Sequence, residues 1–468
     1  MTTHISRYFK DEFKSTIKNL IFCNKENILV IKEGLKKFQE KKFCEALVIF
    51  DKLITLNPSS ADALFTLGNI YYELNDLKKS SFYFRKSLKI FPNSQIIINN
   101  YAITLQSLGE IDKAKKLFEN LIKLNPKNVK AYYRLFRMDL KNFENNYLNK
   151  IKSLKTSAVL SLEDVSLIDF IISQYEKNKD IKNEIKYLES AHTKQFKSNF
   201  LHNSKLNEYH NKLLINNFDK LNFLNESKKF TSLKNKKPIF IIGLPRSGST
   251  LIETLLTQNE KKYYSFGESS IFETIIFNQI KKKIFAKDYD YKNFKISINE
   301  EIFLNSIENT YSYTPNDLLI DKSLENFFYI DLILKVFPQA KFIHSFRNKF
   351  DNMIAIYKSM LIYLPWSHSM DKISNYILNY EKIIQHFKKK YPDKILDVKL
   401  EDFTNSPNVN LKRIYNFCNL HFTDDILKFH NKKNPISKTS SFMQVRNKIQ
   451  KYDESKYKPY YFLIKKFD

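Results

Sequence analysis

The residues with the clearest chemical meaning lie in the stretch PIFIIGLPRSGSTLIETLL, residues 238–256. Its spacing matches the phosphate-binding P-loop G-x-x-x-x-G-K-[ST], with Gly243 and Gly248 as the glycines and Ser249 in place of the lysine. In a nucleoside-triphosphate enzyme that lysine reaches the β- and γ-phosphates. Without it, the backbone N–H groups and the helix N-terminus suit one 5′-phosphate better than a metal-bridged chain. Arg246, at the mouth of the loop, offers a planar fork for an oxyanion.

More charged residues follow short apolar runs that resemble buried strands. These runs are 239–244, 318–320, 341–346 and 395–400, and the residues that follow them are Arg246, Asp321, Lys322, Arg347, Glu401 and Asp402. Alternation of such runs with helical segments predicts a parallel sheet covered by helices. Ligands of such sheets bind outside the carboxyl ends of the strands, so we expect these side chains to converge on one crevice.

The first half of the sequence repeats itself at a fixed interval. The repeated positions include Pro58, Pro92 and Pro126, the aromatic residues Phe50, Phe84 and Phe118, and the pair Gly34 and Gly68. This interval is typical of tetratricopeptide repeats, in which two antiparallel helices form each unit and the units stack into a solenoid. Small residues let the two helices approach closely, and each proline ends the second helix. Of the six glycines in the chain, Gly109 alone has no role in these patterns.

The remaining segments complete the predicted organisation. A fourth unit starting near Val129 has Phe136 where a small residue is expected, which is typical of a capping unit. Residues from 142 onward are polar, helix-patterned and free of glycine up to the apolar run. We therefore predict an N-terminal helical segment (1–26), repeats (27–141), a helical connector (142–236) and a P-loop-like α/β domain (237–468). The fold class is a helical solenoid followed by a parallel sheet flanked by helices.

The ordered motifs resemble those of the tetratricopeptide-containing sulfotransferases, whose catalytic half is similar to tyrosylprotein sulfotransferase. They are PRSGST (245–250), FGE (266–268), DKS (321–323), KFIHSFRNKFDN (341–352), ILDVKLEDF (395–403) and KTSSFMQVR (438–446). The resemblance covers nearly the whole chain. It implies a sulfotransferase fold and transfer of the sulfuryl group of 3′-phosphoadenosine 5′-phosphosulfate (PAPS) to an acceptor hydroxyl, without a metal.

The resemblance also implies a role for each matched residue. Glu268 is the catalytic base that takes the hydroxyl proton. Lys322 and Arg246 stabilise charge on the sulfuryl and phosphate oxygens, and Ser441 lies near the sulfuryl group. The donor is bound by Arg347, at its 3′-phosphate, and by the loop residues Pro245, Arg246, Ser247, Gly248, Ser249 and Thr250. For Glu268 and Lys322 the alternative is a surface residue, and for Lys322 specifically an ion pair with Asp321.

The 3′-phosphate site departs from the family pattern. The family has a serine eight residues after the arginine, and this sequence has Ala355 there. Lys349 or Ser359 are the candidates to replace that contact, since residues four apart share a helix face. Trp366 and His368 are candidates for an acceptor pocket, although a tryptophan in an apolar segment more often packs in the core.

Composition limits the partners without choosing one. The 77 Lys and Arg against 50 Asp and Glu give a formal charge of +27, but the basic residues are spread along the chain, so we do not expect nucleic-acid binding. No apolar run is long enough for a membrane span, and three dispersed cysteines indicate a reducing, cytoplasmic compartment. The hydroxyl acceptor is a protein tyrosine, a carbohydrate or a small molecule, and the repeats offer a surface to a peptide, polysaccharide or protein. The alternative functions are a P-loop nucleotide kinase or NTPase and a non-catalytic repeat scaffold.

Overall fold

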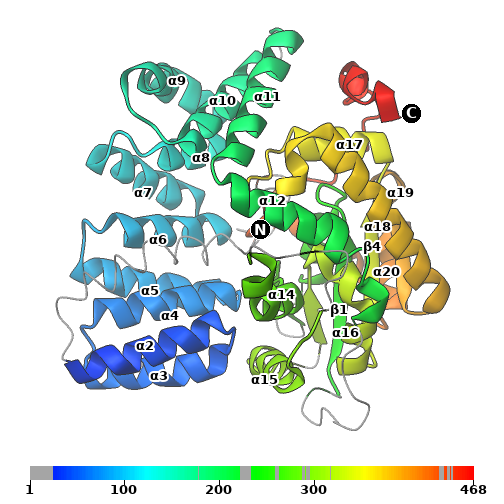
Figure 1. Ribbon diagram of the computed structural model, residues 1–468, viewed down its shortest axis with the longest axis horizontal. Helices are drawn as coiled ribbons and strands as arrows, with labels where there is room; N and C mark the ends of the chain where they lie inside the picture. The colour runs from blue at the N-terminus through cyan, green and yellow to red at the C-terminus, as the bar shows by residue number, and fades with distance from the viewer. Residues whose placement is uncertain are drawn as a thin grey trace.

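The structure is a computed structural model of the 468-residue chain. It describes residues 25–177, 179–221, 233, 235–258, 263–286, 290, 296–316, 318–431, 437–439, 443 and 446–467. Figure 1 shows a stack of paired helices on one side and a sheet with its covering helices on the other. This arrangement confirms the predicted fold class.

The paired helices form the predicted repeats. Their bounds are α2 (Lys25–Gln39), α3 (Phe43–Leu56), α4 (Ala61–Glu73), α5 (Leu77–Ile90), α6 (Gln95–Ser107), α7 (Ile111–Leu124), α8 (Val129–Met138) and α9 (Leu140–Ser157). Asp76 begins α5 by accepting a hydrogen bond from the N–H of Lys79. A Cβ on Gly34 would lie 2.7 Å from the Phe50 ring, and one on Gly68 would lie 2.7 Å from the Phe84 ring. In both units the glycine therefore lies against an aromatic ring of the same unit, which lets the two helices approach closely as predicted.

The turn inside each repeat has a regular feature that the sequence prediction missed. Lys41, Asn75 and Gly109 are separated by the same interval as the repeated prolines, and each has a positive φ, of 63°, 66° and 82° respectively. This left-handed conformation favours glycine and tolerates asparagine. Gly109 therefore has a role after all, since it forms the turn between α6 and α7.

Helices also fill the segment predicted as a connector. They are α10 (Leu162–Glu176), α11 (Ile181–Lys197), α12 (Phe200–Glu208), the single π-helical turn η1 (Tyr209–Leu213) and the 3-10 turn η2 (Phe218–Lys220). In Figure 1 these helices lead from the end of the repeats across to the sheet. The domain boundaries given above stay a prediction.

The sheet has five parallel strands in the order β2-β3-β1-β4-β5. The bounds are β1 (Lys237–Gly243), β2 (Tyr263–Gly267), β3 (Leu318–Asp321), β4 (Lys341–Phe346) and β5 (Ile395–Lys399). Four strands were predicted. The edge strand β2 was missed, because Tyr264 and Ser265 in its middle are only half-buried and its alternation is weak.

Helices cover both faces of the sheet, as predicted. They are α13 (Ser249–Leu256), α14 (Ile271–Ile284), α15 (Glu300–Tyr311), η3 (Leu324–Tyr329), α16 (Ile330–Val336), α17 (Lys349–Tyr357), η4 (Pro365–His368), α18 (Met370–Lys390), α19 (Leu400–Asn405), α20 (Pro407–Phe417), η5 (Asp424–Asn431), η7 (Lys458–Leu463) and η8 (Lys465–Phe467). Along β1, Phe240 and Ile242 pack in one core and Ile239 and Ile241 in the other. This alternation follows from the two-residue period of a strand.

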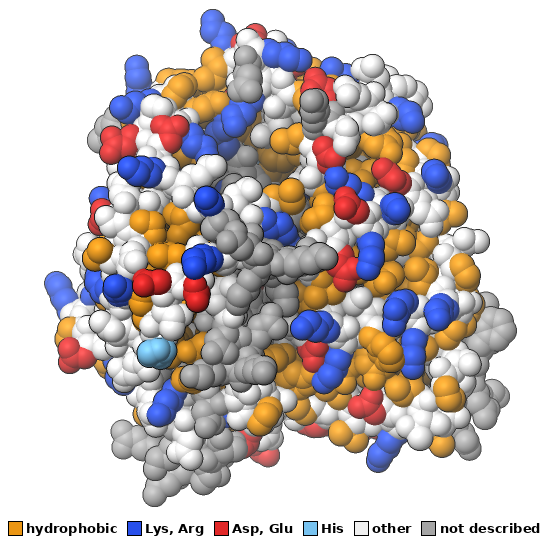
Figure 2. Space-filling view, turned by 180° about the vertical axis from the view of Figure 1, so that it is seen from behind, with side chains coloured by type: hydrophobic (Ala, Val, Ile, Leu, Met, Phe, Trp, Pro, Cys, Tyr) orange, Lys and Arg blue, Asp and Glu red, His pale blue; other side chains and the backbone are white. Residues whose placement is uncertain are grey.

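One face of the molecule shows how charged side chains are distributed. On the face drawn in Figure 2, lysine and arginine side chains are scattered among acidic and apolar ones. Within the described part of the chain, no helix combines the length and the apolar character needed to cross a membrane.

Candidate functional site

The loop after β1 is shaped by close backbone contacts. Gly243 has a φ of 143°, and a Cβ there would lie 2.1 Å from the carbonyl oxygen of Ser345. Gly248, at a φ of 93°, directly precedes α13, so the free N–H groups of the first helical turn face the loop. Arg246 also has a positive φ, of 68°. The two glycines are therefore required by geometry, as the P-loop pattern predicts.

The loop hydroxyls have different surroundings. Ser247 Oγ donates to the carbonyl oxygen of Leu244 at 2.7 Å, so it orders the loop. Thr250 Oγ1 lies 3.3 Å from Thr439 Oγ1, which brings the C-terminal segment against α13. Ser441 lies outside the described residues, and its assigned role stays a prediction.

Arg347 and the loop lie side by side, as predicted for residues that follow neighbouring strands. Arg347 Nη1 donates to the carbonyl oxygen of Arg246 at 3.4 Å. Asn352 Nδ2, in the following helix α17, donates to the carbonyl oxygen of Pro245 at 2.9 Å. Ser345 Oγ, at the end of β4, donates to the carbonyl oxygen of Ser247 at 2.7 Å. These bonds join the phosphate loop to the end of β4.

Positive charge is concentrated at this junction. Burial lowers the pKa of Arg246, and the positive charges of Arg137 and Arg347 lower it further. Arg137 comes from α8 in the repeats, so both halves of the chain contribute. Guanidinium groups gathered in a partly buried place favour an anion, because an anion offsets their mutual repulsion.

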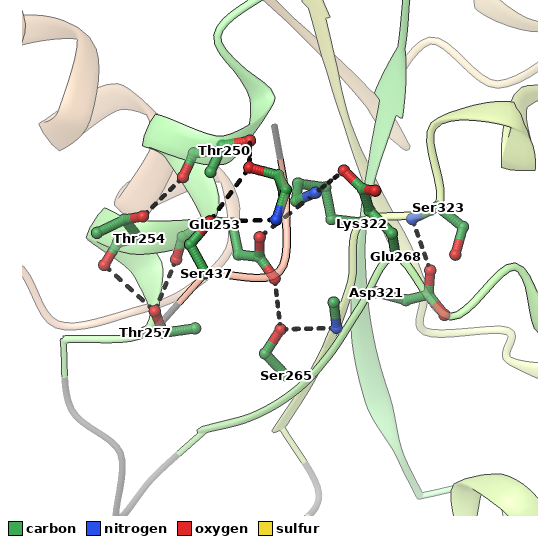
Figure 3. Close-up of polar contacts among 12 residues, drawn as sticks. Thr250, Glu253, Thr254, Thr257, Ser265, Glu268, Asp321, Lys322, Ser323 and Ser437 are labelled. Carbon is green, nitrogen blue, oxygen red and sulfur yellow. Dashed lines mark hydrogen bonds and ion pairs between the residues drawn. The ribbon is translucent and has the colours of Figure 1, made fainter. Parts of the chain in front are cut away.

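The other two predicted catalytic residues form a buried ion pair (Figure 3). Lys322 Nζ lies 2.7 Å from Glu268 Oε1 and 3.5 Å from Glu253 Oε2. The Lys322 side chain is fully buried, and those of both glutamates are 14% exposed. Glu253 comes from α13, one turn after Ser249, and therefore ties this pair to the phosphate loop. Sequence reasoning missed it, although the spacing of four residues from the loop places it on the same helix face.

The ion pair keeps both groups charged. Burial alone would raise the pKa of Glu268, but the charge and the hydrogen bond of Lys322 outweigh it and hold that pKa below its usual range. Burial works in the opposite direction on Lys322, whose pKa is nevertheless raised by Glu268 and Glu253. A carboxylate held ionised in this way can accept a proton at neutral pH.

Asp321 does not pair with Lys322, which excludes the alternative of a surface ion pair. Its buried carboxylate accepts hydrogen bonds from Ser269 Oγ at 2.6 Å, from the Tyr311 hydroxyl at 2.7 Å and from the N–H of Ser323 at 2.9 Å. The neighbouring Lys322 N–H donates to the carbonyl oxygen of Gly267 at 2.9 Å. These bonds fix the ends of β2 and β3, from which Glu268 and Lys322 project.

The surroundings of Arg347 differ from a simple phosphate contact. Its Nη2 donates to the Tyr452 hydroxyl at 2.6 Å and lies 3.7 Å from Asp351 Oδ2, and its guanidinium lies 5.0 Å from the ring centres of Tyr452 and Tyr457. Its Nε has no hydrogen-bond partner among the described residues. One buried donor of Arg347 is therefore left for a ligand.

The residues considered as replacements at Ala355 behave differently. Ala355 itself is buried in the core. Ser359 Oγ donates to the carbonyl oxygen of Ala355 at 2.6 Å, which occupies its hydrogen. Lys349 lines a cavity of about 170 Å³ together with Arg347, and its Nζ lies 3.4 Å from Glu381 Oε2. Of the two candidates, Lys349 is the one that shares a cavity with Arg347.

A second cavity, of about 300 Å³, opens beside Glu268. Its lining includes Lys438, which sequence reasoning did not single out within the last motif. Burial lowers the pKa of Lys438 to about 8, although Glu73, Glu253 and Glu268 raise it. Lys438 Nζ donates to the carbonyl oxygen of Tyr72 in the repeats at 2.9 Å.

Trp366 and His368 do not line this cavity. Trp366 is fully buried and stacks on Tyr376 with 3.8 Å between the ring centres. His368 Nδ1 lies 2.9 Å from His192 Nδ1 in a buried contact. Trp366 therefore packs in the core, which was the expected alternative for a lone tryptophan.

One group of described residues has the composition of a metal site. His210, Glu273 and Glu325 each bring a ligand atom within 4.8 Å of the other two. His210 Nε2 lies 3.5 Å from Glu273 Oε1, and the Tyr376 hydroxyl donates to Glu325 Oε1 at 2.7 Å. Burial and the charge of Glu325 raise the pKa of Glu273, so a proton on Glu273 can remove one of the two negative charges without a metal ion.

Comparison with known proteins matches both halves of the chain. Residues 238–424 match the sulfotransferase family, and residues 61–94 and 97–128 each match a tetratricopeptide repeat. An "Uncharacterized protein" of Aquifex aeolicus is 24% identical over 414 residues, which cover 84% of this chain and 52% of that protein. A TPR repeat-containing protein of Methanocaldococcus jannaschii is 27% identical over 143 residues, which cover 30% of this chain and 25% of that protein. The chain thus spans about half the length of the Aquifex relative.

Solved structures of sulfotransferases are similar at low identity. The sulfotransferase domain from the curacin biosynthetic pathway is 18% identical, with a TM-score of 0.31, and the match covers 47% of this chain and 89% of that one. Sulfotransferase STF9 from Mycobacterium avium is 12% identical, with a TM-score of 0.31, and the match covers 61% and 86%. The chain carries tetratricopeptide repeats, and its residues 238–424 are similar to the sulfotransferase family.

Proposed function

We propose that this protein transfers the sulfuryl group of PAPS to an acceptor hydroxyl. The observation that carries the proposal is the buried Lys322–Glu268 pair at the ends of β3 and β2, joined through Glu253 to a phosphate loop that lacks its lysine. A base, a cation and an anion-binding loop at one edge of a sheet are the groups that sulfuryl transfer requires.

The donor is expected to bind along the loop and the end of β4. The N–H groups at the start of α13 and the guanidinium of Arg246 would hold the 5′-phosphosulfate. Arg347 would hold the 3′-phosphate, for which its Nε is available, and Lys349 beside it would supply the contact that Ala355 lacks. Bound PAPS supplies a sulfuryl group on a phosphate leaving group, so no metal is needed.

The protein's own groups would then handle the proton and the charge. The oxygen of the acceptor hydroxyl forms a bond to sulfur while the bond from sulfur to the phosphate oxygen breaks, and Glu268 takes the proton of that hydroxyl. The negative charge left on the phosphate is stabilised by Arg246 and Lys322. Because Lys322 keeps the pKa of Glu268 low, the base is ionised before the acceptor arrives. Ser441 is the further residue proposed to lie near the sulfuryl group.

Labelled PAPS tests this proposal directly. We expect wild-type protein to bind PAPS in calorimetry and to release 3′-phosphoadenosine 5′-phosphate, slowly with water alone. Glu268→Gln should lower turnover by about 10² to 10⁴ and leave donor affinity unchanged. Arg347→Ala should weaken the binding of PAPS without weakening the binding of the analogue that lacks a 3′-phosphate. Equal losses for both ligands would refute the role of Arg347.

The alternatives predict different results in the same assays. A kinase or NTPase would be stabilised by Mg·ATP in a thermal shift and not by 3′-phosphoadenosine 5′-phosphate. A scaffold would show no turnover for Glu268→Gln to remove. No PAPS binding at any accessible concentration would overturn the sulfotransferase proposal.

The cell compartment and the partners of the repeats are also proposals. Cys44 and Cys418 are free thiols, which fits a reducing compartment such as the cytoplasm. Tetratricopeptide repeats commonly bind a peptide or another domain, and here we propose that they act on the acceptor.

A further inference from the structure

The cavity of about 300 Å³ beside Glu268 lies between the two halves of the chain, and we call it the seam cavity. One wall is the turn between α4 and α5, with Asn75 and Asp76. The opposite wall is α13 and β2, with Glu253 and Glu268, and Lys438 closes one side. Its position next to the proposed base makes it the place from which a hydroxyl can reach Glu268.

The wall formed by the repeats is fixed in place by hydrogen bonds. Asn75 Nδ2 donates to the carbonyl oxygen of Ser265 in β2 at 2.7 Å. The Tyr264 hydroxyl donates to the carbonyl oxygen of Leu74 at 2.6 Å, and the Tyr313 hydroxyl donates to Asp76 Oδ2 at 2.9 Å. A turn held by three bonds to the sulfotransferase half is part of the cavity and not a loose neighbour.

The lining is rich in groups that form hydrogen bonds. It combines the amide of Asn75, the carboxylates of Asp76 and Glu253, the hydroxyls of Thr257 and Ser437, and the ammonium of Lys438. These groups already have partners in the protein: the Asn75 amide donates to Ser265, Asp76 and Glu253 accept from Tyr313 and Ser265, and Lys438 donates to Tyr72. Carboxylate oxygens can accept further hydrogen bonds, and an ammonium group has three N–H donors. A ligand with several hydroxyls around one ring could pair with donors and acceptors on all sides.

The volume points to the same kind of ligand. About 300 Å³ is at the low end for ligand sites in proteins and suits a single ring with its substituents. Tyr264, a half-buried aromatic residue that is also in the lining, offers apolar area for the C–H groups of a sugar ring.

We propose that the seam cavity is the acceptor site and holds one sugar unit of a carbohydrate, with Asn75 and Asp76 of the repeats determining which sugar is accepted. This rests on the proposed function, because Glu268 is taken as the base. A sugar hydroxyl oxygen forms the new bond to sulfur, its proton passes to Glu268, and the product is a sulfate ester. The repeats thereby become part of the substrate site.

The acceptor class is tested with the wild-type full chain and saturating labelled PAPS. A panel of methyl hexosides, methyl hexosaminides, oligosaccharides and a tyrosine-containing peptide is scanned for sulfate esters by mass spectrometry. We expect ester on saccharides and none on the peptide. Sulfation of the peptide alone, or donor hydrolysis with no saccharide sulfated, overturns the sugar assignment. Failure to bind or turn over PAPS at all would refute the proposed function instead, so the two failures are distinguishable.

The role of the repeats is tested with two variants chosen to keep the backbone conformation of the turn. Asn75→Gly suits the positive φ of 66° and mimics Gly109, and Asp76→Asn keeps a side chain able to begin α5. Each should raise the acceptor KM about tenfold, which corresponds to the loss of roughly one hydrogen bond, with the PAPS Kd unchanged. Asn419→Gly, at a φ of 56° outside the cavity lining, is the matched control and should change neither. An unchanged acceptor KM in both cavity variants would overturn the role of the repeats.

Discussion

Removing the ammonium group of Lys322 should lower the free energy of unfolding and favour the protonated form of Glu268. In Lys322→Met, the buried carboxylate of Glu268 loses a partner at 2.7 Å and that of Glu253 a partner at 3.5 Å. Breaking a buried ion pair on one side costs about 3 to 5 kcal/mol of the free energy of unfolding, because the remaining charge stays buried and unpaired. That loss is a large fraction of the roughly 5 to 15 kcal/mol of a typical domain. Burial would then raise the pKa of Glu268 and protonate the proposed base.

Urea denaturation measures this loss, and a double-mutant cycle identifies its cause. Glu268→Gln alone and Lys322→Met alone should each be destabilising, and the double variant should lose less than their sum by about 2 kcal/mol or more. Lys466→Met is the matched control, since Lys466 lies at the same 2.7 Å from Asp371 but the two side chains are 60% and 68% exposed. The control should lose at most about 1 kcal/mol. Additive losses for Lys322 and Glu268 would refute a direct coupling between them.

Two more predictions concern the repeats and the response to pH. Gly68→Ala should lower the free energy of unfolding by about 1 to 3 kcal/mol, because its methyl group would lie 2.7 Å from the Phe84 ring. This loss should be smaller in a Phe84→Leu background. An equal loss in both backgrounds would contradict the role of this contact. Burial lowers the pKa of His192 from 6.5 to about 4, so its contribution to stability is complete above pH 6.5 and falls by up to about 3 kcal/mol as the pH drops towards 4. Denaturation at several pH values should show that the free energy of unfolding changes less with pH in His192→Gln than in the wild type. An unchanged pH dependence would exclude this histidine as a cause.

The repeats could be predicted in detail because their determinants are local. The fixed repeat interval predicts that the two helices approach closely at Gly34 and Gly68, and the structure shows these glycines against the rings of Phe50 and Phe84. The left-handed turn positions were harder to find, because Lys41, Asn75 and Gly109 are chemically unlike one another. What they share is a left-handed backbone conformation. The sequence indicates this conformation only where the residue is glycine or asparagine.

The site was predictable where the residues follow strands. Arg246, Lys322 and Arg347 stand at the carboxyl ends of β1, β3 and β4, and parallel pairing brings such positions together by itself. Glu253 and Lys438 were missed because their positions depend on helix orientation and on packing between distant segments. Pairing of Lys322 with Glu268 in place of the adjacent Asp321 follows from the burial of Asp321 among its own donors, which no sequence pattern reports.

The regular turns of the repeats explain how a helical solenoid can line the proposed site. The turn between α2 and α3 meets α15, where Thr310 Oγ1 donates to the carbonyl oxygen of Lys41 at 3.0 Å. The next turn meets β2 through Asn75, and just before the third turn the carbonyl oxygen of Ser107 accepts from the N–H of Ser437 at 2.9 Å. Because the turns recur once in every repeat on one edge of the stack, that edge contacts the α/β half at successive turns. Evolutionary change in a turn residue such as Asn75 can therefore alter the seam cavity while the helices that support it stay the same.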